Sequence, residues 1–154
     1  MAVNTGKTNA RWIRVFVDDA TAADTPRDIS LDVTNVTIPI NYATADVTGY
    51  SDGVINVTMG HPSMNVTMDG VFSNKGDDGA HTVLSSIVGK NDDIVDYSPY
   101  TLTVQVGIRK APENDDPEFE GLFLCNEYTV NGDLTWHASF HPGGSTTPAW
   151  GVMA

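Results

Sequence analysis

Apolar and polar residues alternate along much of this chain with the period of a β-strand. In residues 100–109 every second residue is apolar, and residues 63–72 place Met64, Val66 and Met68 between polar neighbours. Side chains on a strand point to opposite faces in turn, so each pattern predicts a strand with one buried and one wet face. Short apolar runs bounded by turn residues predict further strands over residues 12–18, 28–40, 54–60, 119–130 and 133–141.

Turn residues and changes of parity set the limits of these strands. The apolar parity switches at Thr34–Asn35 inside residues 28–40, which predicts a β-bulge. His61–Pro62 is expected to break the strand run, because proline cannot donate to a sheet ladder. Asn131–Gly132 predicts a two-residue hairpin turn between the last two strands. The final strand is expected to bury one face made of Leu134, Trp136, Ala138 and Phe140.

One segment, Gly79 to Val88, has the period of a helix instead. Its apolar residues recur three and four positions apart and form one stripe. Asp77 or Asp78 is expected to cap the N-terminus, and Gly89 is expected to end the helix in the left-handed conformation. The residues predicted to pack this helix on the sheet are Val83, Leu84, Ile87 and Val88.

The length of 154 residues fits a single β domain, with residues 1–10 as an N-terminal arm and residues 142–154 as an irregular C-terminal tail. Residues 41–53 form a long polar connection, of a kind that is uncommon in compact domains and often functional. About seven strands and one helix with these faces predict a mainly β fold. The expected architecture is an antiparallel β-sandwich or partly closed barrel with one flanking α-helix.

The charge of the chain is strongly acidic, with 20 acidic and 8 basic residues and a net charge of −12. Tight DNA binding needs cations that displace counterions from phosphates, so this balance disfavours DNA wrapping or groove reading. Residues 1–10 lack the apolar core of a signal peptide, and no apolar run is long enough for a membrane helix. The sequence therefore predicts a protein made and used without export, and without a membrane partner.

No residue pattern marks a catalytic site, a metal site or a cofactor. His137 and His141 have the spacing of a zinc pair on a helix, but on a strand their rings would lie about 13 Å apart. The paired acidic residues lack the spacing of a calcium loop and are expected to be solvated turn residues. Cys125 is the single cysteine and lies in an apolar stretch, so it is expected to be a small buried hydrophobe. These patterns predict a protein that is not an enzyme.

Four segments, taken in order, carry a resemblance to a known family. They are RDISLDVTNVTIPI (Arg27–Ile40), ADVTGYSDG (Ala45–Gly53), MNVTMDGVFSNKGDDGAHTVLSSIVG (Met64–Gly89) and CNEYTVNGDLTWHASF (Cys125–Phe140). In order and spacing they resemble the tail tube, or major tail, proteins of long-tailed, non-contractile bacteriophages, over most of the chain from Trp12 to Phe140. The resemblance implies a structural virion protein that self-assembles into stacked hexameric rings, forming a tail tube for DNA ejection.

The resemblance also implies partners and surfaces. Each copy would contact other copies within and between rings, as well as tape measure, tail terminator and distal tail proteins. Its location would be the virion tail, after synthesis in the host cytoplasm. The connection over residues 41–53 matches the loop that reaches the neighbouring ring, with contact residues Asp46, Val47, Thr48, Tyr50 and Asp52. A polar lumen that DNA passes without sticking is expected to be lined by Asp32, Thr34, Asn65, Thr67 and Asp69.

Two other functions remain open at the level of the sequence. A capsid decoration or head–tail joining protein would also be acidic and β-rich, but it needs one assembly surface where a stacked tube needs two. A carbohydrate-binding β-sandwich would stack a sugar on Trp12, Trp136 or Trp150. Trp136 shares the parity of the predicted core residues, which favours a place in the core instead.

Overall fold

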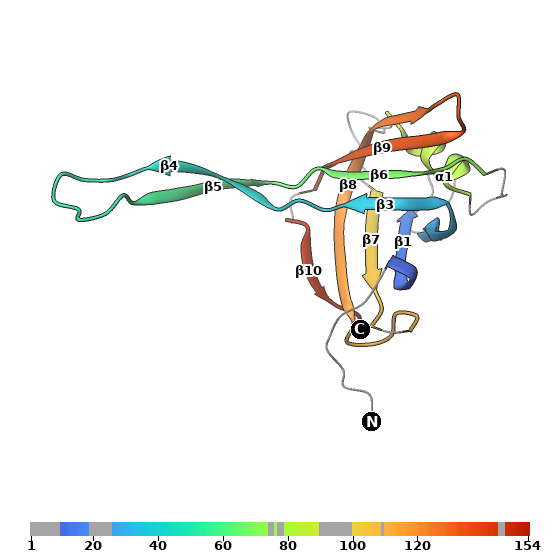
Figure 1. Ribbon diagram of the computed structural model, residues 1–154, viewed down its shortest axis with the longest axis horizontal. Helices are drawn as coiled ribbons and strands as arrows, with labels where there is room; N and C mark the ends of the chain where they lie inside the picture. The colour runs from blue at the N-terminus through green and yellow to red at the C-terminus, as the bar shows by residue number, and fades with distance from the viewer. Residues whose placement is uncertain are drawn as a thin grey trace.

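The described part of the chain is a β-rich body from which one long hairpin projects (Figure 1). The computed structural model describes residues 10–18, 26–73, 76, 79–89, 100–108, 110–144 and 147–154. Its strands are β1 (Ile13–Asp18), β2 (Pro26–Asp28), β3 (Val33–Thr37), β4 (Asn41–Asp46), β5 (Val57–Ser63), β6 (Val66–Val71), β7 (Tyr100–Val106), β8 (Pro117–Val130), β9 (Thr135–Pro142) and β10 (Ala149–Val152). The helical elements are α1 (Ala80–Ile87) and the 3-10 turns η1 (Ala10–Trp12) and η2 (Ser30–Asp32). The prediction of a mainly β fold with a flanking α-helix is confirmed.

Eight of these strands form one antiparallel sheet, in the order β2-β1-β7-β8-β9-β6-β3 with β10 added to β8. β8 belongs to two layers, because residues 118–123 pair with β7 and residues 123–130 pair with β9. The sheet folds back on itself and brings η2, which precedes β3, next to β1. There the Val15 amide of β1 donates to Ser30 Oγ at 2.8 Å. No ladder joins β1 to β3 within the described residues, so the sheet is a partly closed barrel.

The core fills the space between the two layers with alternate residues of the strands. Trp136 on β9 is the largest fully buried side chain, and its indole Nε1 donates to the Val71 carbonyl at 3.2 Å. The ring lies against Gly70 on β6, where a Cβ would overlap both the indole and the Asp32 carbonyl oxygen. Glycine is therefore required at position 70 by the close approach of three segments.

The α1 helix packs against this core through an apolar stripe. The stripe consists of Val83, Leu84 and Ile87, which are fully buried, and Val88, which is half-buried. Gly89 ends the helix with φ of +69°, which confirms the predicted left-handed stop. Its amide donates to the Cys125 carbonyl at 2.9 Å, so the end of the helix is tied to β8.

The single strand predicted over residues 28–40 is divided in the structure. Ser30–Asp32 form the η2 turn, and β3 occupies only Val33–Thr37. A register shift between Val33 and Asn35, opposite β6, confirms the predicted bulge. After β3 the chain leaves the body, so the strand does not continue to Ile40 in the same sheet.

The break predicted at His61–Pro62 is wrong, because both residues lie inside β5. In the described residues β5 pairs only with β4, and a register shift between Tyr42 and Thr44 lies opposite Pro62. Proline has no N–H to donate to a ladder. It is tolerated at the edge of a ribbon or at a bulge because the ladder needs no hydrogen bond from that position.

The β8–β9 hairpin closes with four residues rather than two. The Asn131 amide donates to the Thr135 carbonyl at 2.8 Å, and the Leu134 amide donates to the Asn131 carbonyl at 3.0 Å. Leu134 has φ of +61° and is 58% exposed, so its predicted burial is wrong. The other predicted core residues of this strand, Trp136, Ala138 and Phe140, are fully buried.

The C-terminal segment is more regular than the irregular tail predicted for it. Ala149–Val152 form β10, antiparallel to residues 117–120 of β8. The ladder is continued where the Met153 amide donates to the Asp116 carbonyl at 2.9 Å. Residues 1–9 of the predicted N-terminal arm lie outside the described residues. No helix in the described ranges is long and apolar enough to cross a membrane.

Candidate functional site

The hairpin of β4 and β5, with its connecting tip, is here called the arm (residues 41–63). It continues from the ends of β3 and β6 and extends away from the body (Figure 1). Its strands pair only with each other in the described part of the chain. The sequence predicted a polar connection over residues 41–53, and the structure corrects this to one strand and the tip of an antiparallel ribbon.

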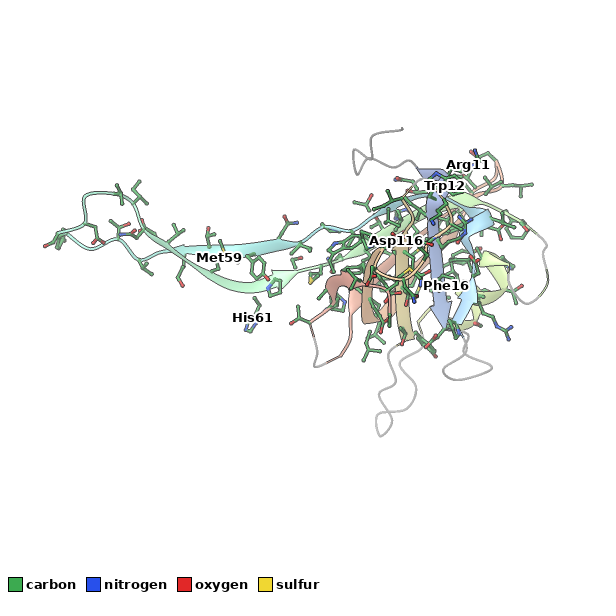
Figure 2. The ribbon with its side chains drawn as sticks, turned by 90° about the horizontal axis from the view of Figure 1, so that it is seen from below. Arg11, Trp12, Phe16, Met59, His61 and Asp116 are labelled. Atoms are coloured by element: carbon green, nitrogen blue, oxygen red, sulfur yellow. The ribbon has the colours of Figure 1, made fainter. Side chains whose placement is uncertain are left out.

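Several large apolar side chains of the arm are exposed. Residues that face each other across a ribbon lie on the same face. Met59 faces Thr44 and Val57 faces Asp46, and Thr44 and Asp46 have the same parity on β4 as Tyr42. Val57 and Met59 therefore lie on the face that also carries Tyr42. Met59 is 67% exposed and projects away from the ribbon in Figure 2. The exposed apolar residues of the arm are Tyr42, Val47, Tyr50, Val54, Ile55, Val57 and Met59. An isolated two-stranded hairpin is marginally stable, and clustered apolar exposure marks interaction sites, so the arm has the properties of a contact surface.

Two carboxylates organise the tip of the arm. Asp46 Oδ1 accepts from the Thr48 amide at 2.8 Å, and Asp52 Oδ2 accepts from the Gly49 amide at 2.7 Å. Hydrogen bonds from Thr48 hold the pKa of Asp46 below its usual value, and the Gly49 amide does the same for Asp52. Three of the predicted loop residues, Asp46, Thr48 and Asp52, therefore shape the tip. The other two, Val47 and Tyr50, are exposed.

A polar face covers the outside of the layer formed by β3, β6, β9 and the second half of β8. Two cross-strand rows make it up, Thr37–Thr67–Ser139–Glu127 and Asn35–Asp69–His137–Thr129. His137 Nδ1 lies 2.8 Å from Asp69 Oδ1. These two rows contain two carboxylates and no lysine or arginine. Of the predicted lumen residues, Thr67 and Asp69 lie in the rows, Thr34 donates to the Asp69 carbonyl at 3.2 Å, and Asn65 is exposed just before β6.

Asp32, which the sequence predicted as a lumen residue, does not lie on this polar face. It lies in η2, is 7% exposed, and its Oδ2 accepts from the Ala80 amide at 2.9 Å. Gly79 holds the N-cap position of α1 without a side-chain cap, so Asp32 supplies the acceptor from 48 residues away. A carboxylate at a helix N-terminus satisfies a free amide and interacts favourably with the helix dipole. The predicted caps Asp77 and Asp78 lie outside the described residues.

Two edges of the polar layer are open in the described residues. At one side β3 ends the sheet, and a groove of about 120 Å³ separates it from β1. At the other side residues 126–130 of β8 pair with β9 alone. Unpaired edges are templates for strands of another chain, so this layer can be extended at both sides.

The described residues offer little chemistry beyond these surfaces. No three His, Cys, Asp or Glu side chains converge there as a metal site would require. Cys125 is buried, as predicted, and burial raises the pKa of its thiol to about 11. The thiol is therefore protonated and unreactive at neutral pH.

The three tryptophans lie on three different elements, η1, β9 and β10, and make separate contacts. Trp136 is buried in the core, and Trp150 packs on Phe119 at a centroid distance of 5.4 Å. Trp12 is half-buried, and the Arg11 guanidinium lies 4.7 Å from its ring centroid (Figure 2). Each ring is thus already in contact with another side chain or with the core.

Comparison with known proteins gives matches in structure but not in sequence. No family model matches the sequence, and no curated protein matches it. A chain in the solved structure described as "Virion of native gene transfer agent (GTA) particle" aligns over 96% of this chain and 100% of its own length, with a TM-score of 0.62 and 16% identity. A chain from "Tail of empty GTA particle computed with helical refinement, C6 symmetry" covers the same shares, with a TM-score of 0.59 and 18% identity.

A third match widens this set. A chain from the sixfold-symmetrised structure of the anti-feeding prophage (AFP) baseplate aligns over 90% of this chain and 91% of its own, with a TM-score of 0.56 and 6% identity. At these identities the likeness concerns the fold. The chain therefore shares its fold with chains of a gene transfer agent virion and tail and of a prophage baseplate, which agrees at the level of the fold with the resemblance to phage tail proteins.

Proposed function

We propose that this protein is a structural component of a phage-like tail, in which six copies form a ring and rings stack into a tube that conducts DNA. Support comes from chains of similar fold in particles whose descriptions name a virion, a tail with C6 symmetry and a sixfold baseplate. In this role the protein acts through contacts between identical copies and performs no catalytic step. Tape measure, tail terminator and distal tail proteins are its further expected partners in the virion tail.

The arm is the single observation that carries the proposal. Tyr42, Val57 and Met59 share one of its faces and are exposed, and the ribbon stands clear of the body. Their burial therefore requires another molecule. Burying each side chain of this size contributes about 1.5–3 kcal/mol, and the contact would be repeated by every copy of a ring.

Ring closure uses the open edges of the polar layer. Pairing β3 of one copy with residues 126–130 of β8 in the next would satisfy the backbone groups of both edges. The polar face would then continue from copy to copy and surround a lumen. In this arrangement a single domain would supply both the ring contacts and the arm.

The polar face suits a lumen through which DNA slides. Asp69 and Glu127 would repel phosphates, and cations there would bind DNA with an affinity summed over many copies. Replacing both by lysine in assembled particles is expected to slow DNA ejection strongly, because each ring would gain many phosphate contacts. Glu120→Lys, on the exposed side of the other layer, is the matched control. Unchanged ejection by the Asp69→Lys/Glu127→Lys particles would remove the lining from the proposal.

The assembly itself is tested with the purified chain. Sedimentation and negative-stain microscopy are expected to show long hollow tubes for the wild type above a critical concentration. Replacing residues 41–63 by a short turn should leave the fold intact, because β3 and β6 are already paired antiparallel neighbours. This variant should form rings or monomers but no tubes, whereas Met59→Leu should form tubes. A wild-type chain that remains monomeric at every concentration and in the particle would contradict the proposal, and discrete trimers would favour a decoration protein.

A further inference from the structure

The turn between β8 and β9 contains the only Asn–Gly pair of the sequence, Asn131–Gly132. Both residues are exposed, as are the two that follow them in the turn. Glycine has no Cβ, so the main-chain nitrogen after Asn131 is open to the side-chain amide that precedes it. The pair therefore places a nucleophile and an electrophile next to each other in an exposed segment.

The Gly132 amide stands outside the hydrogen bonds that close this turn. The Asn131 amide donates to the Thr135 carbonyl at 2.8 Å, and the Leu134 amide donates to the Asn131 carbonyl at 3.0 Å. Among the described residues the Gly132 amide donates to no other group of the protein. A Cβ at this position would meet nothing within 4 Å, and the backbone of Gly132 is not left-handed. Neither packing nor a turn hydrogen bond thus obstructs its nitrogen.

The side-chain amide of Asn131 is restrained by one hydroxyl. Asn131 Nδ2 donates to Thr135 Oγ1 at 3.2 Å, and this hydroxyl donates to Asp133 Oδ1 at 2.7 Å. A distance of 3.2 Å is at the long end of the range for such a bond, so the amide is restrained without being fixed.

The other asparagines in the described ranges are less favourably placed for the same attack. Each of them precedes a residue whose Cβ crowds the main-chain nitrogen. These following residues are Val36, Tyr42, Val57, Val66, Asp115 and Glu127. All but one lie in strands, and the Asp115 amide is engaged with the Met153 carbonyl at 3.0 Å. Asn131 is therefore the favoured position.

We propose that Asn131 is a spontaneous modification site, where the side-chain amide is lost as ammonia in the folded chain at a rate limited by the Thr135 hydroxyl. The Gly132 nitrogen attacks Asn131 Cγ and gives up its proton, the bond from Cγ to Nδ2 breaks, and ammonia leaves with that proton. Water then opens either C–N bond of the resulting succinimide ring and yields aspartate or isoaspartate. The net reaction consumes one water and releases one ammonia, and it does not depend on the proposed function.

Both products weaken the turn, and both add a negative charge to a chain whose net charge is already −12. In the aspartate product a carboxylate replaces the donor that faced Thr135 Oγ1, so two carboxylates compete for one hydroxyl proton. Hydrogen bonds from the Thr135 side chain and backbone hold the pKa of Asp133 below its ordinary value, and this pKa should rise when the competitor appears. In isoaspartate the main chain runs through Cγ, so the carbonyl that accepts from Leu134 is displaced.

Mass spectrometry of the purified full chain measures the reaction directly. After incubation in warm, mildly alkaline buffer, peptide mapping is expected to find aspartate and isoaspartate at position 131, with an equal amount of ammonia released. Gly132→Ala should lose about tenfold or more of the rate, because access and orientation decide an intramolecular attack. Its fold should be retained, since the added Cβ has open space. Thr135→Val should react several-fold faster, whereas Thr135→Ser keeps the hydroxyl and should match the wild type.

Thermal melting tests the consequence for the turn. Asn131→Asp, which reproduces one product, should melt below the wild type. Asn126→Asp places the same charge at an exposed position of β8 and is the matched control, which should melt as the wild type does.

Each outcome decides a stated part of the proposal. If the folded chain keeps Asn131 intact while the urea-unfolded chain deamidates there, the turn blocks the attack and the modification site is overturned. Equal rates for Gly132→Ala and the wild type have the same meaning. Equal rates for Thr135→Val and the wild type, with both folded, remove the role of the hydroxyl. None of these measurements requires tube formation, so a failure here leaves the proposed function untouched.

Discussion

Replacing Asp32 by alanine removes the only side-chain acceptor that the structure provides for the first amide of α1 among the described residues. Asp32 Oδ2 accepts from the Ala80 amide at 2.9 Å, and the residue is 7% exposed. Loss of an N-cap costs about 0.5–2 kcal/mol, and a buried amide without a partner costs about 1–3 kcal/mol. These two figures describe the same lost contact and are not added, so Asp32→Ala is expected to reduce the free energy of unfolding by about 1–2 kcal/mol, the range the two figures share. In Asp32→Asn an oxygen acceptor remains and only the charge is lost, so about 1 kcal/mol is expected.

Urea unfolding is the appropriate assay, followed by tryptophan fluorescence in a chain that lacks residues 41–63 and that, by the proposed function, forms no tubes. For a domain of this size each kcal/mol also lowers the melting temperature by roughly 2–4 °C. The pKa of Tyr128 is raised to about 12, first by burial and then by the charge of Asp32. In Asp32→Asn the titration of Tyr128 should therefore move to lower pH, which gives a second readout.

The matched control is Glu120→Ala, which removes a carboxylate from an exposed position on β8. Substitutions at such positions usually change stability by less than about 0.5 kcal/mol. If Asp32→Ala unfolds like this control, Asp32 does not cap the helix and the reasoning is refuted. An effect on DNA ejection without an effect on stability would restore its role as a lumen residue.

Three further outcomes are expected. Gly70→Ala should lower the free energy of unfolding in urea by about 1–3 kcal/mol or more, because the added Cβ overlaps the Trp136 indole and a backbone carbonyl. Gly151→Ala has open space around its Cβ and should change the free energy of unfolding little, so equal losses for the two variants would contradict the packing. Cys125 should resist alkylation in the folded chain at pH 8 and react on unfolding, and rapid labelling of the native chain would count against burial. Because burial raises the pKa of its thiol from the ordinary value of 9.0 to about 11 in the folded chain, its contribution to stability should be lost as pH rises from about 9 to 11. Leu134→Asn should stabilise the unassembled chain by about 0.5–1 kcal/mol in thermal unfolding, since asparagine tolerates the left-handed backbone, and a loss of stability would show that Leu134 packs within one copy.

The sequence by itself determined most of the regular body. The alternation over residues 100–109 and the apolar run over residues 119–130 predict β7 and β8 to within a few residues, and the stripe from Val83 to Val88 predicts α1. These signals are local, since each depends on the period of a strand or helix that must bury one face. The left-handed end at Gly89 follows from the same local chemistry.

The arm illustrates a first limit of sequence reasoning. Its strands expose both faces, so no burial imposes an alternating pattern, and residues 41–53 resemble an ordinary polar loop. The same holds for β10, whose four residues are all exposed and which is formed only because β8 offers an edge. In both cases pairing with a partner strand, and not the period of apolar residues, decides the conformation.

Asp32 and Gly70 show what only the tertiary structure decided. A carboxylate in a polar strand pattern is expected to face water, yet folding brings Asp32 to the start of a helix 48 residues away. Gly70 could have marked a bulge or a turn, and only the approach of Trp136 and η2 shows why a side chain is excluded. Local periodicity sets which residues form strands and helices, whereas contacts between distant segments set which polar groups are buried and which apolar groups remain exposed.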